Sequence, residues 1–388
     1  MSALLRNAIT AAVLLSITLL PSMEGFAQGQ EPVHGLTDEP SEPVELSEFN
    51  PDFHDAPYFE TWDFWMWSED GTVMLLQFLS SSFGFGIEKQ GSGRLIVISP
   101  EAINIGDDPD GVSFADRGWS WDDGWSWAEV PLDITWRDSF LRGDGETFEF
   151  YLRGRNRTTY MEATMTLVDP LYRPGDGRLE YGWDRHFFYE QIAIPRFTFE
   201  GRLNRKDHRD DEDSWEDVSG VGYGEHTLTN NFPFDIAQRF IGFRALRDDG
   251  LTIIADGLTT PQEFGGRGIN WGVVSLGGQP LIESAEVTIV PLNETPFVGA
   301  GNEYSVPGGL QIQMQDGANW ARVNVYNGEL VSATSPFARV GTFLRAMLGA
   351  IMAPFDFEST AEYEAWVHVD GETAYVSGRG WMTTNFTE

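Results

Sequence analysis

The sequence predicts an all-β protein made of two antiparallel β-barrels in tandem. Three observations support this fold class: short runs in which apolar and polar residues alternate, turn dipeptides between those runs, and a glycine motif that occurs once in each half of the chain. Alternation with a period of two is typical of strands with one buried face. The 388 residues are enough for two such barrels. The exception is a short helix that we expect in the second half.

The composition excludes several classes of function. The chain has 60 Asp and Glu against 25 Lys and Arg, which gives a formal net charge of -35. This surplus repels phosphate backbones and anionic membrane surfaces, so we expect no nucleic-acid partner. The absence of cysteine excludes disulfides, thiolate metal sites and a cysteine nucleophile. The acidic surplus indicates either solubility in a salty compartment, which is the simpler interpretation, or an acidic binding face.

Residues 1–27 are predicted to be a secretory signal peptide. Arg6 supplies the positive charge, Ala11–Leu20 the apolar core, and Gly25–Ala27 a small-x-small cleavage site. The apolar run is short for a membrane span, although a retained N-terminal anchor is the alternative. Residues 28–50, rich in Glu, Pro and Gly, are predicted to be a flexible acidic leader. We therefore expect an exported, soluble protein, periplasmic or extracellular, whose membrane or transporter contacts are transient.

The alternating runs that begin at Tyr58 define the strands. Met161–Leu167 has an apolar residue at every odd position. The same period occurs in three further runs: Glu286–Val290, Leu310–Gln315 and Arg322–Tyr326. Dipeptides such as Asp144–Gly145 and Asn327–Gly328 predict hairpin turns between strands. Closing such strands into barrels removes exposed sheet edges.

One stretch has a helical period instead. Apolar residues recur every three or four positions in Val340–Met352, and Pro354 follows. This pattern predicts a short helix packed across the second barrel. Its methionines would also suit a lid over an apolar cavity, because thioether side chains adapt to irregular surfaces.

A six-residue motif indicates an internal duplication. Val218–Tyr223 reads Val-Ser-Gly-Val-Gly-Tyr, and Val376–Trp381 reads Val-Ser-Gly-Arg-Gly-Trp. A predicted strand precedes each copy, and an Asn-containing stretch follows it. The duplication predicts an N-terminal barrel over residues 51–233 and a C-terminal barrel over residues 234–388.

The two copies differ directly after this motif. Glu225 and His226 stand side by side in the first copy only. Adjacent residues of a strand point to opposite faces, so one of the two should face the barrel interior unless a bulge turns both inward. A buried acid or imidazole would suit proton transfer or a ligand hydroxyl. The alternative is a surface pair near a turn.

The motif Gly220-x-Gly222-Tyr223-x-Glu225-His226 resembles an element of the tandem-lipocalin family that contains hydroxyneurosporene synthase, a carotenoid hydratase, and survival-factor-type lipid-binding proteins. The aromatic strand, Asp-Gly turn and second strand in Phe59–Phe78 are similar to that family's opening. His186–Gly201 resembles its His-x-Phe-x-Pro-Arg run. The resemblance implies two fused lipocalin-like barrels and an apolar cavity for a lipid, isoprenoid or other hydrophobic molecule.

The resemblance also implies a hydratase site, from which this chain departs. Asp256 is the only acid near the place where hydratase members have the Asp that protonates a double bond. Leu228 stands where the family has Trp, and Ile254 where a Tyr would be wanted. These losses weaken the hydratase interpretation, because a carbocation needs π-faces or fixed charge nearby.

Other chemistries have weaker support. The six His include no His-x-His or His-x-x-x-His pair, and no phosphate loop, dinucleotide motif or Ser nucleophile elbow occurs. We therefore expect neither a metal nor a cofactor. The tryptophans of Trp119–Trp127, with Trp136, could stack on sugar rings, but as a strand-turn-strand they would line a barrel wall.

The function expected from the sequence is that of a carrier for a hydrophobic small molecule, a lipid or isoprenoid, held in a lipocalin-type cavity. Seven residues are expected to bind it: Trp62, Trp65, Phe78, Arg196, Tyr223, Glu225 and His226. The aromatic rings of the first strands would contact its apolar body, and Arg196 would neutralise Glu225 or a ligand anion. The alternative is an enzyme that hydrates, isomerises or cyclises a polyene or terpenoid, with Asp256, Glu225 and His226 as its catalytic residues.

Overall fold

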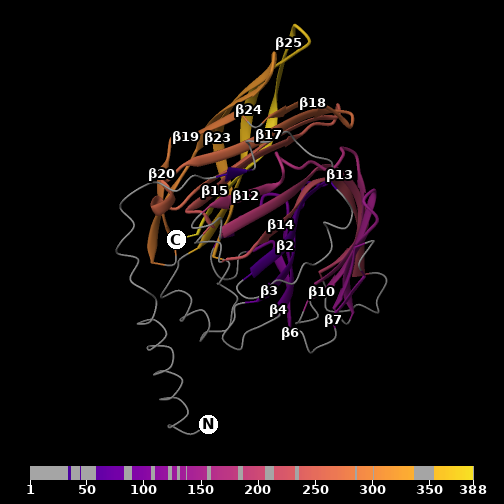
Figure 1. The fold of residues 1–388 in the computed structure, drawn as a ribbon. Helices are drawn as coiled ribbons and strands as arrows, with labels where there is room; N and C mark the ends of the chain where they lie inside the picture. Colours follow the sequence, from indigo (N-terminus) through magenta and orange to yellow (C-terminus); the bar gives the residue numbers. More distant parts are fainter. Residues whose placement is uncertain are drawn as a thin grey trace, which may run out of the picture.

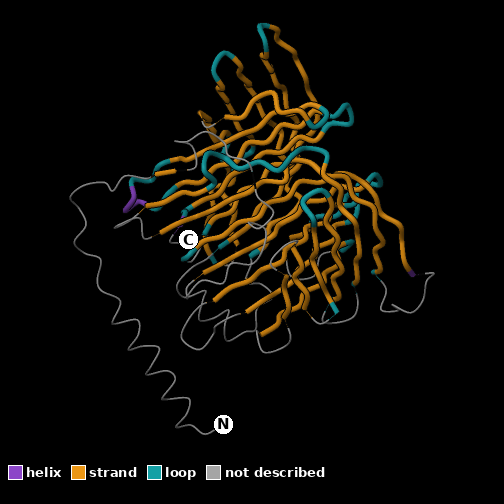
Figure 2. The backbone as a smooth tube through the Cα atoms, turned by 45° about the vertical axis from the view of Figure 1, so that its right-hand side comes forward, coloured by secondary structure: helices purple, strands orange, loops and turns teal. Residues whose placement is uncertain are grey.

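The computed structural model describes residues 34–35, 44, 58–82, 90–105, 110–120, 125–128, 132–136, 138–154, 159–181, 187–205, 214–231, 236–284, 286–299, 301–335 and 354–387. They form two large curled antiparallel sheets and a two-stranded ribbon (Figures 1 and 2). The predicted signal peptide, most of the predicted leader and the predicted helix Val340–Met352 lie outside the described residues. Within the described part of the chain, no helix is long and apolar enough to cross a membrane.

The first sheet is a meander whose first long strand also pairs with its last. The strands are β1 (His34–Gly35), β2 (Tyr58–Ser68), β3 (Val73–Ser82), β4 (Gln90–Ile98), β6 (Val112–Ser120), β7 (Trp125–Ala128), β8 (Leu132–Trp136), β9 (Ser139–Gly143), β10 (Thr147–Arg153), β11 (Tyr160–Leu167), β12 (Arg178–Tyr181), β13 (Phe187–Asn204) and β14 (Trp215–Thr229). Pairing of β2 with β14 curls the sheet around one apolar core.

The second sheet repeats this plan. Its strands are β15 (Arg239–Leu246), β16 (Leu251–Thr259), β17 (Gly268–Leu276), β18 (Gln279–Ser284), β19 (Glu286–Leu292), β22 (Gly309–Asp316), β23 (Asn319–Thr334), β24 (Phe355–Val369) and β25 (Glu372–Phe386), with β5 (Asn104–Ile105) added beside β23. Its first strand, β15, pairs with its last, β25. A ribbon of β20 (Thr295–Gly299) and β21 (Asn302–Val306) and a 3-10 turn, Gln262–Phe264, complete the described elements.

The predicted fold class is confirmed, because both halves are curled antiparallel sheets with the same closing pair. The two copies of the glycine motif occupy equivalent places, on β14 and on β25. The chain passes from one sheet to the other between Thr229 and Arg239. Two parts of the predicted leader are held by the first sheet: His34–Gly35 pairs with β12, and Val44 contacts the first core.

The glycines of the motif allow neighbouring strands to approach closely. A Cβ added at Gly220 would lie 2.1 Å from the carbonyl oxygen of Trp67, and one at Gly222 would lie 2.2 Å from the Phe197 ring. In the second copy, a Cβ at Gly380 would lie 2.6 Å from the Phe243 ring. The repeated motif therefore leaves room for an aromatic ring of the sheet interior.

We expect Gly220→Ala to lower the free energy of unfolding by about 1–3 kcal/mol, because the backbone of Trp67 would have to move. The matched control is Gly268→Ala on β17, where a Cβ would meet only the Asn270 side chain, at 3.7 Å. Urea unfolding of both variants measures the difference. Equal urea midpoints for the two variants would show that the close approach at Gly220 does not contribute to stability.

Candidate functional site between the two sheets

The outer faces of the two sheets pack against each other. Along β2, alternation places Trp62 and Phe64 in the first core, which leaves Asp63 and Trp65 on the outer face. A separate apolar cluster contains residues of both sheets: Tyr172, Ala193, Tyr223, Ile254, Trp271 and Val273. The second sheet therefore covers the outer face of β2 and β14, and polar residues on that face are removed from bulk water.

Two polar rows lie on these outer faces, one on each sheet. In the first sheet, strand register aligns Glu225 (β14), Asp63 (β2), Gln77 (β3) and Arg94 (β4). In the second sheet it aligns Glu358 (β24), Thr383 (β25), Gly242 (β15), Asp256 (β16) and Trp271 (β17). The glycine motif makes Glu225 equivalent to Thr383, and Asp63 equivalent to Gly242. The two rows thus occupy equivalent strand positions but carry different side chains.

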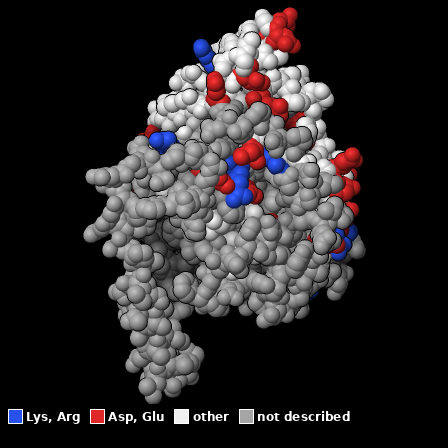
Figure 3. Space-filling model, in the orientation of Figure 1, with Lys and Arg blue, Asp and Glu red and all other residues white. Residues whose placement is uncertain are grey.

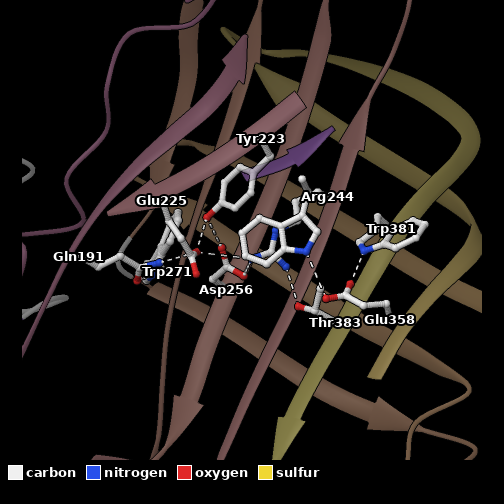
Figure 4. A network of polar contacts seen from close by, with 10 residues as sticks. Gln191, Tyr223, Glu225, Arg244, Asp256, Trp271, Glu358, Trp381 and Thr383 are labelled. Atoms are coloured by element: carbon white, nitrogen blue, oxygen red, sulfur yellow. Dashed lines mark hydrogen bonds and ion pairs between the residues drawn. The ribbon is translucent and has the colours of Figure 1, made fainter. Parts of the chain in front are cut away.

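Arg244 is the central cation of the site (Figure 4). Its Nη2 lies 2.7 Å from Asp256 Oδ1 and 3.7 Å from Glu225 Oε2, and its Nη1 donates to Thr383 Oγ1 at 2.7 Å. A Cβ at Gly242 would lie 2.1 Å from both Arg244 Nη1 and Asp256 Oδ1. The missing side chain at this position therefore makes room for the ion pair.

Aromatic rings surround this guanidinium. Its central carbon lies 4.5 Å from the centre of the Tyr223 ring and 5.0 Å from that of Trp65. Burial works against the charged form of Arg244, but Asp256 and the other nearby acids keep its pKa above the ordinary value. Arg244 therefore provides a permanent positive charge at the centre of the interface.

The Tyr223 hydroxyl bridges two carboxyl groups, one from each sheet. Its oxygen lies 2.9 Å from Glu225 Oε2 and 3.0 Å from Asp256 Oδ2. A phenol has one proton, so it can donate to only one of them, and the other contact requires a protonated carboxyl. Burial raises the pKa of Asp256 to about 7; Arg244 opposes this shift, and Glu225 adds to it. Burial also holds the pKa of Tyr223 well above its ordinary value.

Side-chain amide and indole groups extend the network on either side. Gln191 Nε2 donates to Glu225 Oε2 at 3.1 Å and accepts, through Oε1, from Trp271 Nε1 at 3.0 Å. On the other side, Trp65 Nε1 donates to Glu358 Oε1 at 3.1 Å, and Trp381 Nε1 donates to the second oxygen of Glu358. Burial raises the pKa of Glu358 to about 8, and the two indole donors oppose the shift.

Two further acids place more carboxyl groups at the interface. Asp63 accepts from Gln77 Nε2 at 2.7 Å, and burial together with Glu225 raises its pKa to about 7. Burial raises the pKa of Asp356 to about 6, while Arg94 opposes the shift. Burial therefore favours the protonated form of these carboxyl groups. No group of three or more His, Cys, Asp or Glu in the described part of the chain is arranged to hold a metal ion.

The central carboxyl groups remain partly accessible. The Glu225 side chain is 17% exposed and that of Asp256 is 10% exposed. Glu225 Oε1 has no hydrogen-bond partner among the described residues, whereas Oε2 contacts Tyr223 and Gln191. The two acids therefore keep some contact with solvent.

The structure brings together four of the residues singled out from the sequence: Trp65, Tyr223, Glu225 and Asp256. Arg196 lies elsewhere at the interface. It follows Pro195, where β13 is irregular, and its Nη1 donates to the carbonyl oxygen of Arg247 at 2.9 Å. Arg196 ties the β15–β16 turn to the first sheet, and the cation beside Glu225 is Arg244 instead.

The other three residues lie inside the first sheet. His226 stacks on Trp62 with ring centres 4.9 Å apart, and its Nε2 lies 2.9 Å from Glu60 Oε1. Burial lowers the pKa of His226 to about 3, so the imidazole is neutral. Trp62 and Phe78 have no exposed surface, because neighbouring side chains cover them. Glu225 and His226 thus point to opposite faces, as strand alternation requires.

Sequence reasoning missed several members of the site, notably Arg244, Glu358 and Gln191. A usable signal was present for Arg244, which stands between Phe243 and Ala245 in an otherwise apolar run. Each of these polar residues occupies an outward position that ordinarily faces water. Only the packing of one sheet on the other shows that this face is covered.

Solved structures share this architecture, although no family model and no curated protein matches the sequence. An AttH-like protein from Nitrosomonas europaea aligns with a TM-score of 0.59 at 14% identity, over 88% of this chain and 96% of that one. Kievitone hydratase from Nectria haematococca aligns with a TM-score of 0.55 at 12% identity, over 92% and 96%. CghA with Sch210972 aligns with a TM-score of 0.52 at 11% identity, over 92% and 99%.

These proteins are lipocalin-like tandem barrels, and the chain has their fold. The lipocalin-like part of the predicted fold class is thereby confirmed. At such low identities the likeness concerns the fold alone. Membership of the carotenoid-hydratase family remains a prediction from the motifs.

Glu358 should make stability depend on pH. Its pKa is about 8 in the folded protein and 4.5 in an ordinary Glu, so between these values the folded state keeps a proton that the unfolded state has released. The free energy of unfolding therefore falls as pH rises through this window, by at most about 1.4 kcal/mol per pH unit from this group. We expect Glu358→Gln to flatten the decline, measured by urea unfolding at a series of pH values.

The control for this measurement is Glu362→Gln, which changes an exposed residue of the same strand. The control should keep the wild-type dependence on pH. The same slope in Glu358→Gln and wild type would mean that Glu358 ionises alike in the folded and unfolded states.

Proposed function

We propose that the protein binds a hydrophobic small molecule between its two barrels and acts on it by general acid–base chemistry, as a hydratase, isomerase or cyclase of a polyene or terpenoid. The observation that carries this proposal is the Tyr223 hydroxyl between Glu225 and Asp256. This arrangement holds a transferable proton in a buried site at neutral pH, which is what protonation of a double bond requires.

The roles follow from the geometry. Glu225 has one oxygen, Oε1, without a hydrogen-bond partner among the described residues, and this oxygen would contact the ligand. Tyr223 connects Glu225 to Asp256, whose pKa of about 7 suits a proton reservoir near neutral pH. Arg244 would compensate the negative charge left after the proton moves.

Aromatic rings do lie near the acids, although not at positions 228 and 254, where the family resemblance would place them. Leu228 contacts Tyr58 in a small separate cluster, and Ile254 lies in the apolar cluster between the sheets. The rings nearest the acids are those of Trp65, Tyr223 and Trp271. Arg244 already lies over Tyr223 and Trp65, so a developing cation would depend on the Trp271 ring and on the nearby carboxylates.

The comparisons support the proposal by analogy. One protein with this fold is named as a hydratase, and another is described in complex with the small molecule Sch210972. Export is part of the same proposal, since the predicted signal peptide would bring the protein to an apolar ligand outside the cytoplasm.

Carriage without turnover is the second candidate function. The observation in its favour is that both oxygens of Asp256 already have partners, Tyr223 and Arg244. A network satisfied in this way can hold a ligand's polar end without moving a proton. A carrier and an enzyme would use the same interface, so a proton-transfer measurement distinguishes them.

We expect the wild-type protein to incorporate deuterium from heavy water into an unsaturated terpenoid, with squalene, lycopene and geranylgeraniol as probes followed by mass spectrometry. Asp256→Asn and Tyr223→Phe should each reduce incorporation by about a hundredfold or more, because they interrupt the proton path. Native mass spectrometry should show that both variants still retain the probe.

The control is Asp249→Asn at the exposed β15–β16 turn, which should leave incorporation unchanged. A stoichiometric probe that is retained without any exchange would favour the carrier. Exchange at the wild-type rate in Asp256→Asn would refute the proposed proton path.

A further inference from the structure

The outer face of the second sheet carries aromatic side chains at its free end. Strand register aligns Thr288 (β19), Gln313 (β22), Arg322 (β23), Trp366 (β24) and Tyr375 (β25) in one row. The next row toward the hairpin end contains Gln315, Trp320, His368 and Thr373. Figure 1 shows the turn between β24 and β25 at the top of the molecule, beyond the strands of the first sheet.

The rings on this face are only partly covered. Tyr375 is 55% exposed, and its ring centre lies 5.4 Å from that of Trp366, at an interplanar angle of 56°. Trp320 stacks on His368 at 5.4 Å, with the Arg322 guanidinium 5.2 Å from its ring centre. The equivalent positions of the first sheet carry charged residues instead, Arg202 on β13 and Asp217 on β14. The outward ring pair of β24 and β25 is therefore specific to the second sheet at these positions, and rings left partly in water indicate a binding surface.

Several charged groups of this face have partners within the sheet. Glu364 accepts from the Tyr375 hydroxyl at 3.1 Å, and Glu362 accepts from Asn327 Nδ2 at 2.9 Å. Arg379 forms an ion pair with Glu329 at 3.0 Å. Tyr375 and Asn327 are neutral donors, so Glu364 and Glu362 keep their charge, and a basic peptide is the alternative partner that polylysine tests.

An anionic partner and a second copy of the chain are disfavoured by charge. Asp370 and Glu372 flank the hairpin turn, and Figure 3 shows acidic side chains at that end of the molecule. The whole chain has a formal net charge of -35, so a polyanion, an acidic membrane or another copy would be repelled.

The groups left for a partner are ring faces and neutral hydrogen-bonding side chains. Gln311 and Gln313 are exposed beside the ring rows, and neither has a hydrogen-bond partner among the described residues. With strands about 4.8 Å apart, a row across five strands extends roughly 19 Å. Stacking surface together with amides in a line matches a chain of sugar rings, which have apolar faces and hydroxyl edges.

We propose that the outer face of β19 and β22–β25 binds a neutral polysaccharide. Trp366 and Tyr375 stack on the sugar rings, and Gln313 and Arg322 bind their hydroxyl groups. This surface is separate from the acid network, although both use the same face of β24, with Glu358 at one end of the strand and Trp366 toward the other. The polysaccharide would hold the protein in place while the inter-barrel site remains free.

The test is affinity gel electrophoresis of the full chain in gels that contain hydroxyethylcellulose, soluble starch or glycol chitin. We expect at least one of these to retard the wild-type protein. Tyr375→Ala and Trp366→Ala should each weaken that binding by about tenfold or more. Phe140→Ala should not, although Phe140 also lies beneath an arginine, Arg142, in the first sheet.

Tyr375→Phe provides a variant that keeps the ring and loses only the hydroxyl, and it should keep most of the affinity. No retardation of the wild type by any of the three glycans would overturn the proposal. So would equal retardation of wild type and Tyr375→Ala. Binding of polylysine or dimerisation that Tyr375→Ala abolishes would also overturn it, in favour of a protein partner.

Discussion

The packing of the two sheets depends on one interaction, the ion pair that neutralises the buried guanidinium of Arg244. Arg244 belongs to the second sheet, and its ring contacts, Tyr223 and Trp65, belong to the first. A charge buried this deeply is tolerated only with a partner, and loss of one partner from such a pair typically costs about 3–5 kcal/mol. Asp256 is that partner. Ion pairs and hydrogen bonds, as well as apolar contacts, therefore determine how the two barrels pack against each other. The same contacts hold the acids in place for a ligand.

Duplication explains how one face could acquire this chemistry. The two outward rows occupy equivalent registers, so packing the halves together placed the same strand positions opposite each other. Asp63 on the first sheet corresponds to Gly242 on the second, where a side chain would collide with the ion pair. The two rows are therefore complementary at this position, since the first carries an acid, Asp63, where the second has Gly242. An asymmetric site resulted from a symmetric arrangement.

The sequence predicted the fold well because its signals are local. Period-two alternation and the repeated glycine motif depend on each strand and its immediate neighbours, and both recur in the structure. The site was predicted in part. Tyr223, Glu225 and Asp256 were found through the difference between the copies and through the family motif. Arg244 and Glu358 were missed because their importance depends on which outer face the other sheet covers. Trp62 and Phe78 were placed with the ligand since alternation identifies an inward face, but it does not reveal that other side chains fill it.

The short strand β5 has a consequence for how the chain folds. Asn104 and Ile105 come from the first half but pair with β23 of the second sheet, and Asn104 Nδ2 donates to Ser332 Oγ at 2.8 Å. Closing a loop of this length is entropically costly and occurs late in folding. The first half thus adds a short strand to the second sheet, and the second half expressed alone would lack it. The two sheets are therefore linked by backbone pairing of β5 with β23 as well as by the side chains of the interface.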